Sequence, residues 1–182
     1  MQLNSDKIRI KNIVYTAAMT AVIAVCAWIT VPFTVPFTMQ TFGVMLSLKT
    51  LGGKRGTISV LIYITLGGIG VPVFSGFAGG AGVLFGPTGG YILGFFIGAL
   101  VYWALERYTV KLWANIAVTA LFLLICYAFG TAWFVILMDM RDKAVGISGA
   151  LSLCVLPYII PDMIKLFLAD RIGKKLRKHV AF

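Results

Sequence analysis

Uncharged apolar runs recur along almost the whole chain, and they constrain its fold more than any other feature. Each run is roughly 14 to 26 residues long, against roughly 20 apolar residues needed by a helix that crosses a bilayer core about 30 Å thick. With 182 residues, 60% of them hydrophobic and 12% charged, the chain lacks the polar surface that covers a water-soluble globule. The sequence therefore predicts an all-α integral membrane protein with one domain, 1–182.

The formal net charge of +10 would suggest a nucleic-acid partner if the protein were soluble. Here the basic residues stand at the ends of the apolar runs, where the positive-inside bias of membrane proteins accounts for them. We therefore expect this chain to lie in a lipid bilayer and to bind no nucleic acid.

Six membrane helices are predicted, and proline and glycine set most of their boundaries. Pro32 and Pro36 end the first helix, and the second closes on Gly52 and Gly53. Pro87 fits just ahead of a helix start. The predicted ranges are 10–30, 39–51, 57–70, 88–105, 112–137 and 147–169, followed by a basic tail over 171–182.

Two connecting segments, 31–38 and 71–86, carry no charge. This is unusual for an aqueous loop and natural for a loop that lies over a cavity or in the membrane interface. The helices 39–51 and 57–70 are short, because roughly 14 residues span only about 21 Å. Loops buried within the protein must complete the membrane there, since lipid cannot satisfy their backbone groups.

The basic residues test the six-helix topology, which places both termini on one side of the membrane. Only Arg141 and Lys143 fall on the opposite side, where Asp139 and Asp142 flank them. The side of the termini is therefore predicted to be cytoplasmic. It collects Lys7, Arg9, Lys11, Lys49, Lys54, Arg55, Arg107, Lys111, Arg171, Lys174, Lys175, Arg177 and Lys178.

Asp162 and Lys165 are the strongest candidates for a binding site. They are three residues apart, hence on one face of the last helix, and Pro157 and Pro161 just upstream expose backbone carbonyls. One charge alone in the membrane centre costs about 2.5–3.5 kcal/mol, whereas the two together can neutralise each other. The pattern favours a solute site. A structural ion pair, or a Lys165 that extends to the cytoplasmic surface, is the alternative.

Small residues suggest both ligand contacts and helix contacts. The glycine-rich segment 71–91 lets the backbone approach a ligand closely, and Tyr91 could form a wall of an apolar pocket. Two stripes of small residues could pack helices within the chain or dock another membrane subunit. One stripe includes Ala17, Ala18, Ala21 and Ala24, and the other Gly90, Gly94 and Gly98.

Catalytic and metal-binding patterns are missing from the sequence. Cys26, Cys126 and Cys154 lie within apolar runs and are expected to be buried hydrophobic residues rather than disulfides or metal ligands. His179 belongs to the basic tail, and no nucleophile–base arrangement or nucleotide-binding motif occurs. We expect neither enzyme activity, nor a cofactor, nor a metal. The first apolar run is interpreted as an uncleaved helix.

The chain resembles the BioY family, the biotin-specific S components of energy-coupling factor (ECF) transporters. The resemblance covers nearly all of the sequence, and four motifs in order carry it together with the six predicted spans. These motifs are Val35-Pro-Phe-Thr-Met-Gln-Thr41, Gly53-Lys-Arg-Gly-Thr-Ile-Ser59, Gly86-Pro-Thr-Gly-Gly-Tyr91 and Pro161-Asp-Met-Ile-Lys165.

The resemblance implies a six-helix protein of a prokaryotic plasma membrane that binds biotin from outside, with cytoplasmic termini. Asp162 and Lys165 match vitamin-site residues of the family, and the ureido ring of biotin offers N–H donors to a carboxylate and a carbonyl to a cation. Whether Lys165 meets the ureido ring or the valerate carboxylate stays open. Gln40, Tyr91 and Gly86 are further expected contacts. The expected lid contains Pro32, Phe33, Pro36 and Phe37.

The resemblance also implies partners. Ala17 and Ala21 match the family's contact with a transmembrane T component, and two ABC-type ATPases would drive transport. Some relatives carry an asparagine where this chain has Ala78 and an arginine where it has Ile92, so fewer polar ligand contacts are expected from that side. Three alternatives remain: an S component for another small vitamin, a membrane enzyme acting on a lipid-soluble substrate, and a purely structural membrane subunit.

Overall fold

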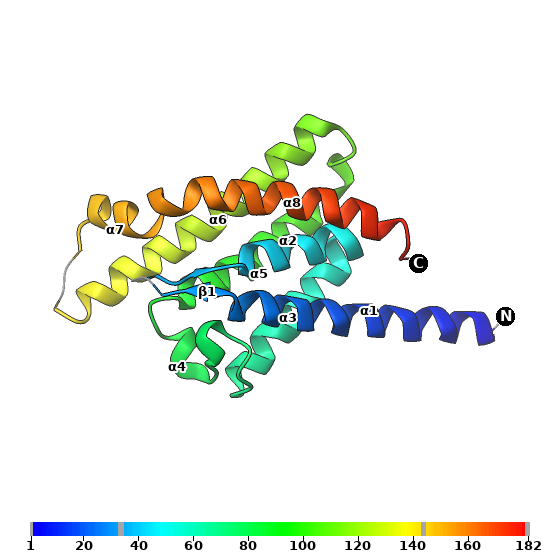
Figure 1. The fold of residues 1–182 in the computed structure, drawn as a ribbon, viewed down its shortest axis with the longest axis horizontal. Helices are drawn as coiled ribbons and strands as arrows, with labels where there is room; N and C mark the ends of the chain where they lie inside the picture. Colours follow the sequence, from blue (N-terminus) through cyan, green and yellow to red (C-terminus); the bar gives the residue numbers. More distant parts are fainter. Residues whose placement is uncertain (1, 33–34, 143–144, 181–182) are drawn as a thin grey trace.

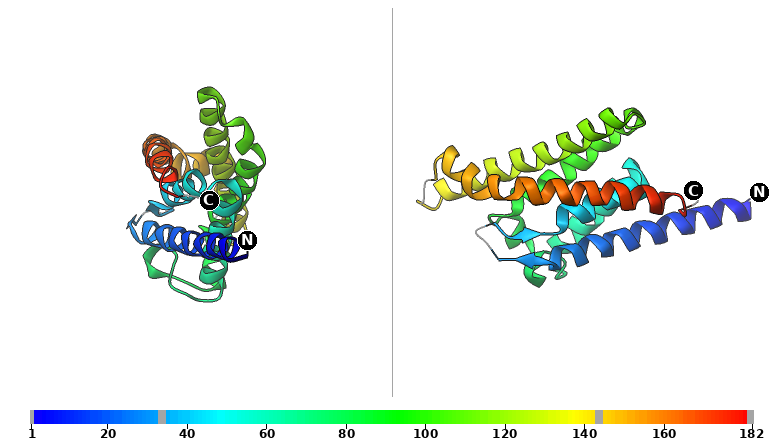
Figure 2. Two further views of the ribbon diagram at one scale, coloured as in Figure 1. Left: turned by 90° about the vertical axis from the view of Figure 1, so that its right-hand side faces the viewer. Right: turned by 45° about the horizontal axis from the view of Figure 1, so that its top comes forward.

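The structure, a computed structural model, describes residues 2–32, 35–142 and 145–180. It is a bundle of helices with the two chain ends at the same end of the molecule (Figures 1 and 2). The helices are α1 (Gln2–Trp28), α2 (Gln40–Leu51), α3 (Gly53–Gly68), α4 (Ala81–Leu84), α5 (Gly89–Leu105), α6 (Leu112–Asp139), α7 (Ile147–Cys154) and α8 (Ile159–Arg177). Short 3₁₀ turns lie at η1 (Ser75–Phe77), η2 (Glu106–Tyr108) and η3 (Leu156–Tyr158).

The predicted count of six membrane helices is not confirmed. In the part of the chain that the structure describes, four helical stretches are long and apolar enough to cross a membrane. With 12 and 16 residues, α2 and α3 fall short of that length, as the sequence suggested. The four stretches are Asp6–Trp28, Gly89–Tyr108, Leu112–Asp139 and Ile147–Arg177.

Several predicted helix boundaries differ from the observed ones. Positions 2–9, before the first apolar run, are helical, because their polar residues include no helix breaker. Gly52 alone turns the chain with a φ of 82°, so α3 begins at Gly53 rather than at 57. The predicted helix 147–169 is interrupted before Pro157, where Val155 leaves helical geometry. Beyond 169, α8 continues to Arg177, so most of the predicted tail is helical.

The segment predicted as a loop over 31–38 contains a short antiparallel β-hairpin. Its strands are β1 (Thr30–Val31) and β2 (Phe37–Thr38), with Thr30 opposite Thr38 and Val31 opposite Phe37. The prolines stop α1, and the strand pairing then satisfies backbone groups that the helix leaves open. The hairpin lies at the end of the bundle that is remote from both chain termini (Figure 2).

The glycine-rich segment after α3 folds back onto the bundle. The ring of Phe74 packs against Gly67 of α3, where a Cβ would overlap the ring, and it meets Tyr63 edge-on at 5.5 Å between ring centroids. The indole of Trp28 donates to the carbonyl of Pro72 over 2.9 Å, which ties the segment to α1. This loop is therefore held by protein contacts on two sides, as an apolar loop at the membrane requires.

The stripe of small residues on α5 serves packing within the chain. Gly94 and Gly98 approach Cys126 and Phe122 of α6 so closely that a Cβ would lie 3.0 Å and 2.8 Å from their atoms. At Gly90 a Cβ would overlap the Trp133 side chain and lie 2.6 Å from the carbonyl oxygen of Phe129. These glycines let α5 and α6 pack at short range.

Gly90→Ala is therefore expected to lower protein stability by about 1–3 kcal/mol, the usual cost of overpacking a filled interface. Gly82→Ala is the matched control, because nothing lies within 4 Å of a Cβ at Gly82. Thermal unfolding of both variants in the same detergent measures the difference. Equal melting temperatures for the two variants would contradict the close α5–α6 contact.

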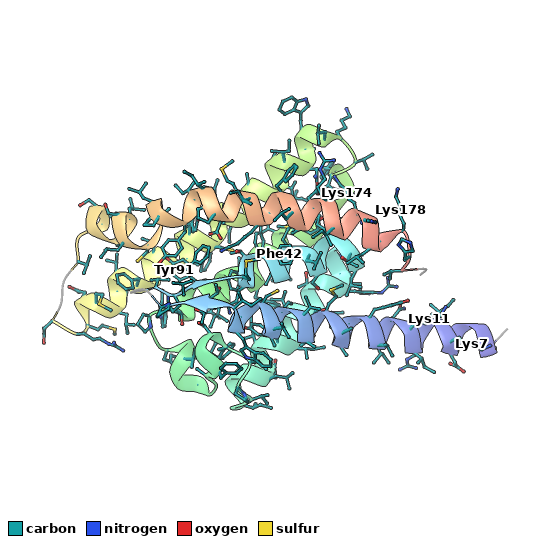
Figure 3. The ribbon with its side chains drawn as sticks, in the orientation of Figure 1. Lys7, Lys11, Phe42, Tyr91, Lys174 and Lys178 are labelled. Carbon is teal, nitrogen blue, oxygen red and sulfur yellow. The ribbon has the colours of Figure 1, made fainter. Side chains whose placement is uncertain are left out.

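Basic side chains gather at the end of the bundle where both termini lie. Lys7 and Lys11 project from the free end of α1, and Lys174 and Lys178 from the end of α8 (Figure 3). Large apolar side chains are exposed along the helices between the two ends, among them Ile13, Leu124 and Ile160. Such a surface fits contact with lipid tails.

Candidate functional site

A cavity of about 120 Å³ lies between the β-hairpin and the first turns of α2, α5 and α8. The side of α6 and residues of the glycine-rich segment complete its walls. Apolar and aromatic side chains dominate the lining, with a few polar groups among them, as in small-molecule sites generally. The lining includes Val35, Pro36, Thr38, Gln40, Thr41, Ser75, Thr88, Tyr91, Ile92, Tyr127, Tyr158, Asp162 and Lys165.

Asp162 supplies a buried carboxylate to this cavity and is 4% exposed. Its Oδ1 accepts a hydrogen bond from the Thr41 hydroxyl at 3.0 Å, and its Oδ2 accepts one from the Tyr127 hydroxyl at 2.8 Å. The Lys165 ammonium lies 2.8 Å from Oδ1. Three donors from three helices therefore hold the carboxylate and fix its orientation.

Lys165 is also buried, at 5% exposure, and connects α8 to the hairpin. Its ammonium donates to the carbonyl oxygen of Thr38 at 2.6 Å and lies 3.7 Å from the ring centroid of Phe37. The predicted pair of Asp162 and Lys165 is thus present, and Lys165 does not extend to the end of the bundle where the termini lie. Its cation is desolvated but compensated by a carboxylate, a carbonyl and an aromatic face.

Gln40 and Tyr91 line the same cavity, as the sequence suggested. The Gln40 amide donates to the Tyr63 hydroxyl at 2.7 Å and accepts from the Thr38 hydroxyl at 2.9 Å. The Tyr91 hydroxyl donates to the carbonyl of Cys154 at 3.3 Å. Gly86 is not among the described residues that line the cavity, and its carbonyl accepts from the Trp133 indole at 2.9 Å.

Three of the four residues predicted to form a lid, Pro32, Pro36 and Phe37, are described by the structure, and they have different surroundings. Pro36 lines the cavity, and Phe37 stacks on Tyr158 at 6.1 Å between ring centroids besides covering Lys165. Pro32 is exposed, and Phe33 lies outside the described residues. The Tyr158 hydroxyl donates to the carbonyl of Val35, which fastens the hairpin to η3, just before α8.

Sequence reasoning missed Thr41, Tyr127 and Tyr158. The hydroxyls of Thr41 and Tyr127 face Asp162 from positions 121 and 35 residues away in the chain, so no local spacing brings them together. A tyrosine in the middle of the uncharged run 112–137 was the available signal, because a buried hydroxyl requires a polar partner.

Ala17 and Ala21 lie elsewhere, on an exposed face of α1. They line a groove between α1 and α3, together with Ile58 and Ile62. Behind them, the Thr20 hydroxyl donates to the backbone of Ser59, and α1 and α3 meet there directly. Unlike the glycines of α5, these two alanines are left uncovered by the described part of the chain.

The described residues contain no group of three His, Cys, Asp or Glu side chains that could hold a metal ion. Cys26, Cys126 and Cys154 are buried and unbridged. The cavity can therefore offer one fixed carboxylate, one ammonium and several hydroxyl and amide groups within an apolar enclosure. Such a set of groups suits recognition of a small solute with both hydrogen-bond donors and acceptors.

Comparisons with known proteins agree with this geometry. The family profile described as BioY family matches residues 2–182. The "Biotin transporter BioY" of Thermotoga maritima is 41% identical, over 92% of this chain and 96% of that protein. The "Probable biotin transporter BioY" of Pyrococcus horikoshii is 38% identical, over the same shares.

A solved structure is also similar in fold. It is described as the S-component for biotin from an ECF-type ABC transporter, and it matches with a TM-score of 0.80 and 29% sequence identity. The match covers 93% of this chain and 92% of that one.

Proposed function

The chain belongs to the BioY family, and from that premise we propose that it is the biotin-binding S component of an ECF-type vitamin transporter. It is a multi-pass membrane protein, in accord with its apolar helices and its relatives. The observation that carries the proposal is the buried pair of Asp162 and Lys165 on the cavity wall. The protein acts in uptake by binding its solute, not by catalysis.

The ureido ring of biotin fits the pair chemically. A ureido group presents N–H donors beside a carbonyl acceptor, and the cavity presents a carboxylate beside an ammonium at 2.8 Å. We infer that Asp162 accepts from an N–H and that Lys165 donates to the ureido carbonyl. Lys165 is the only lysine or arginine among the described lining residues, so the valerate carboxylate would then meet neutral donors such as Ser75, Thr88 and Tyr91.

The size of the cavity supports a lid that must move for loading. Its volume of about 120 Å³ lies below the range of roughly 300–1,000 Å³ that holds drug-sized ligands. Lys165 holds the hairpin through Thr38 and Phe37, so a ligand that takes over the ammonium releases these contacts. We infer that the hairpin opens to admit biotin and closes over it.

Phe37→Ala is expected to speed biotin dissociation up to about tenfold, because the closed hairpin loses the stacking of Phe37 on Tyr158. Such an aromatic pair contributes about 0.5–1.5 kcal/mol, and tenfold corresponds to about 1.4 kcal/mol. The measurement is the release of radiolabelled biotin from purified protein after a chase with unlabelled biotin. Phe167→Ala, which removes an exposed ring on α8, is the matched control. Equal release rates for both variants would contradict the lid role of Phe37.

The proposed topology has six crossings with both termini in the cytoplasm. Basic side chains gather at the end where the termini lie, which the positive-inside rule assigns to the cytoplasm. The short α2 and α3 would complete their crossings with the hairpin and the glycine-rich segment. The partners would be a T component, which would contact Ala17 and Ala21, and two ABC-type ATPases.

Calorimetry on detergent-purified protein tests the function. Biotin should bind with measurable heat, whereas thiamine and riboflavin, which lack the paired N–H donors of a ureido ring, should give none. Biotinamide has lost the carboxylate charge. It should bind within about threefold of biotin if Lys165 meets the ureido end. It should bind much more weakly if Lys165 meets the carboxylate, because one charged hydrogen bond contributes about 1.5–3 kcal/mol. A loss of biotinamide binding would place Lys165 at the valerate carboxylate, and no biotin binding by folded protein would refute the function.

A further inference from the structure

A second cavity lies at the basic end of the bundle, and none of the described residues that line it also lines the first cavity. It has a volume of about 550 Å³ and lies between the end of α5, the turn η2, the start of α6 and the end of α8. Its lining includes four basic residues, Lys49, Arg107, Lys174 and Arg177, and one carboxylate, Glu106. Nothing in the proposed biotin site uses these groups.

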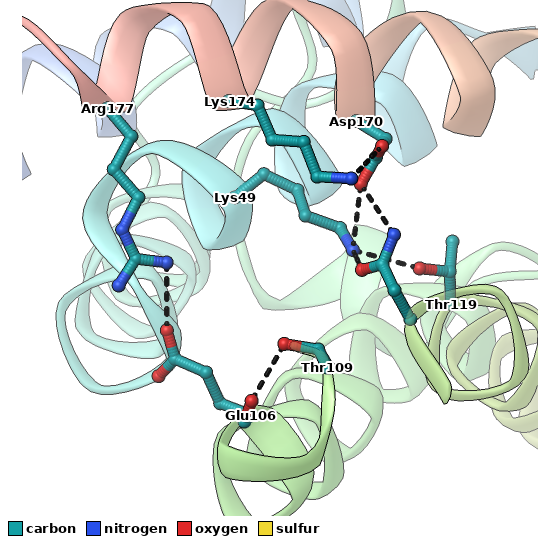
Figure 4. Close-up of polar contacts among 8 residues, drawn as sticks. Lys49, Glu106, Thr109, Thr119, Asp170, Lys174 and Arg177 are labelled. Atoms are coloured by element: carbon teal, nitrogen blue, oxygen red, sulfur yellow. Dashed lines mark hydrogen bonds and ion pairs between the residues drawn. The ribbon is translucent and has the colours of Figure 1, made fainter. Parts of the chain in front are cut away.

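One carboxylate next to this cavity is shared by two lysines. Asp170 lies 3.2 Å from the buried ammonium of Lys49 and 2.7 Å from the exposed ammonium of Lys174 (Figure 4). Asn115 joins them, since its amide nitrogen donates to Asp170 at 2.9 Å and its oxygen accepts from Lys49. Asp170 therefore compensates only one of the two lysine charges.

The other carboxylate is also engaged. Glu106 accepts from the backbone N–H of Gly53 at 2.7 Å and from Arg177 at 3.3 Å. Arg107 lies over the ring of Tyr108, 4.7 Å from its centroid. With Asp170 counted, four cations face two carboxylates, so the cavity keeps an excess of two positive charges.

Exposed aromatic and apolar side chains around this cavity indicate that it lies at the level of the lipid headgroups. Trp103, Tyr108 and Trp113 are exposed around it, and Val110 and Leu112 are exposed between η2 and the first turn of α6. Tryptophan and tyrosine concentrate at the level of lipid headgroups, and basic pockets between helix ends at the cytoplasmic side bind anionic headgroups. The cavity therefore combines positive charge with an apolar border.

We propose that this cavity binds the headgroup of an anionic phospholipid, with Arg107 and Lys174 as ligands of the phosphate. The acyl chains lie along the exposed apolar side of α6, beyond Trp113. Lys174 and Arg177 are each 53% exposed, so their remaining donors can reach a phosphate without breaking the ion pairs. The apolar border distinguishes a lipid from free phosphate, which would gain nothing from it.

Native mass spectrometry of the detergent-solubilised protein tests the proposal, with phosphatidylglycerol or phosphatidylcholine added at equal concentration. We expect phosphatidylglycerol to be retained, and Arg107→Gln combined with Lys174→Gln to lower its retention at least about fivefold. Lys7→Gln combined with Lys11→Gln is the matched control, because it removes the same charge at the same end on α1. The control pair should retain the lipid as the parent does.

Three results would overturn the proposal: equal retention of phosphatidylcholine, equal loss in the control pair, or displacement of the lipid by an equal concentration of inorganic phosphate. Lys174 also holds Asp170, so the double variant could fold poorly. Arg107→Gln alone decides in that case, because Arg107 lies over the exposed ring of Tyr108 and its loss leaves the ion pairs of Asp170 and Glu106 in place. A lipid-free melting temperature equal to that of the parent verifies its fold.

Discussion

Asp162→Asn should weaken biotin binding at least about 100-fold, since lost charge-assisted hydrogen bonds contribute about 1.5–3 kcal/mol each and 1.4 kcal/mol is tenfold. An amide of similar shape can still accept one hydrogen bond, but it no longer compensates the Lys165 ammonium 2.8 Å away. That cation remains buried without its carboxylate, which disfavours the arrangement that the ureido ring would meet. Calorimetry on purified protein measures the loss.

The matched control is Asp170→Asn, on the same helix and also paired with a buried lysine, Lys49. Asp170 does not line the cavity that holds Asp162, so affinity should stay within about threefold of the parent, the range of a change without direct contact. If both variants lost affinity equally, the effect would come from helix α8 as a whole. The double variant Asp162→Asn with Lys165→Gln removes both charges and should fold well while binding no biotin.

Tyr127→Phe should have a smaller effect in the same experiment. It removes one of the donors that orient the carboxylate, but Thr41 and Lys165 still hold Asp162. Biotin affinity should therefore be much lower in Asp162→Asn than in Tyr127→Phe, because the carboxylate contacts the ligand whereas the tyrosine only positions the carboxylate.

The sequence was sufficient for those parts of the site that depend on local spacing. Asp162 and Lys165 share a face because helix geometry brings residues three apart together, and the structure shows them in contact. Thr41 and Tyr127 complete the same site from other helices, and only tertiary packing brings them to Asp162. Tyr127 stands out in an uncharged run because a buried hydroxyl needs a polar partner, but no local spacing identifies Asp162 as that partner.

The fold shows the same difference between features set by local sequence, which were predicted, and features set by other interactions, which were missed. Apolar runs and helix breakers located the main helices, because burial in lipid and proline sterics act locally. The hairpin of β1 and β2 was missed, since strands of two residues leave no alternating pattern. Similarly, Gly90 was open to two interpretations until Trp133 and Phe129 were seen to fill the space beside it.

Ala17→Trp combined with Ala21→Trp is expected to lower biotin uptake at least about tenfold. Biotin binding should stay within about threefold of the parent. The reason is that the tryptophans would block docking of the T component on α1, which matters for transport and not for ligand binding. The two alanines lie one helical turn apart and are exposed beside the groove between α1 and α3. Indole rings would fill the space into which a helix of the T component could pack. Uptake is measured in cells that produce the T component and both ATPases.

Ala18→Trp provides the matched control for this experiment. Ala18 is exposed on the same helix but does not line the groove, because one residue turns the side chain by about 100°. Its tryptophan should face lipid and leave uptake near that of the parent. Uptake that stays normal in the Ala17 and Ala21 variant would remove the groove from the partner contact. Loss in the Ala18 variant as well would mean that any bulk on α1 disturbs assembly.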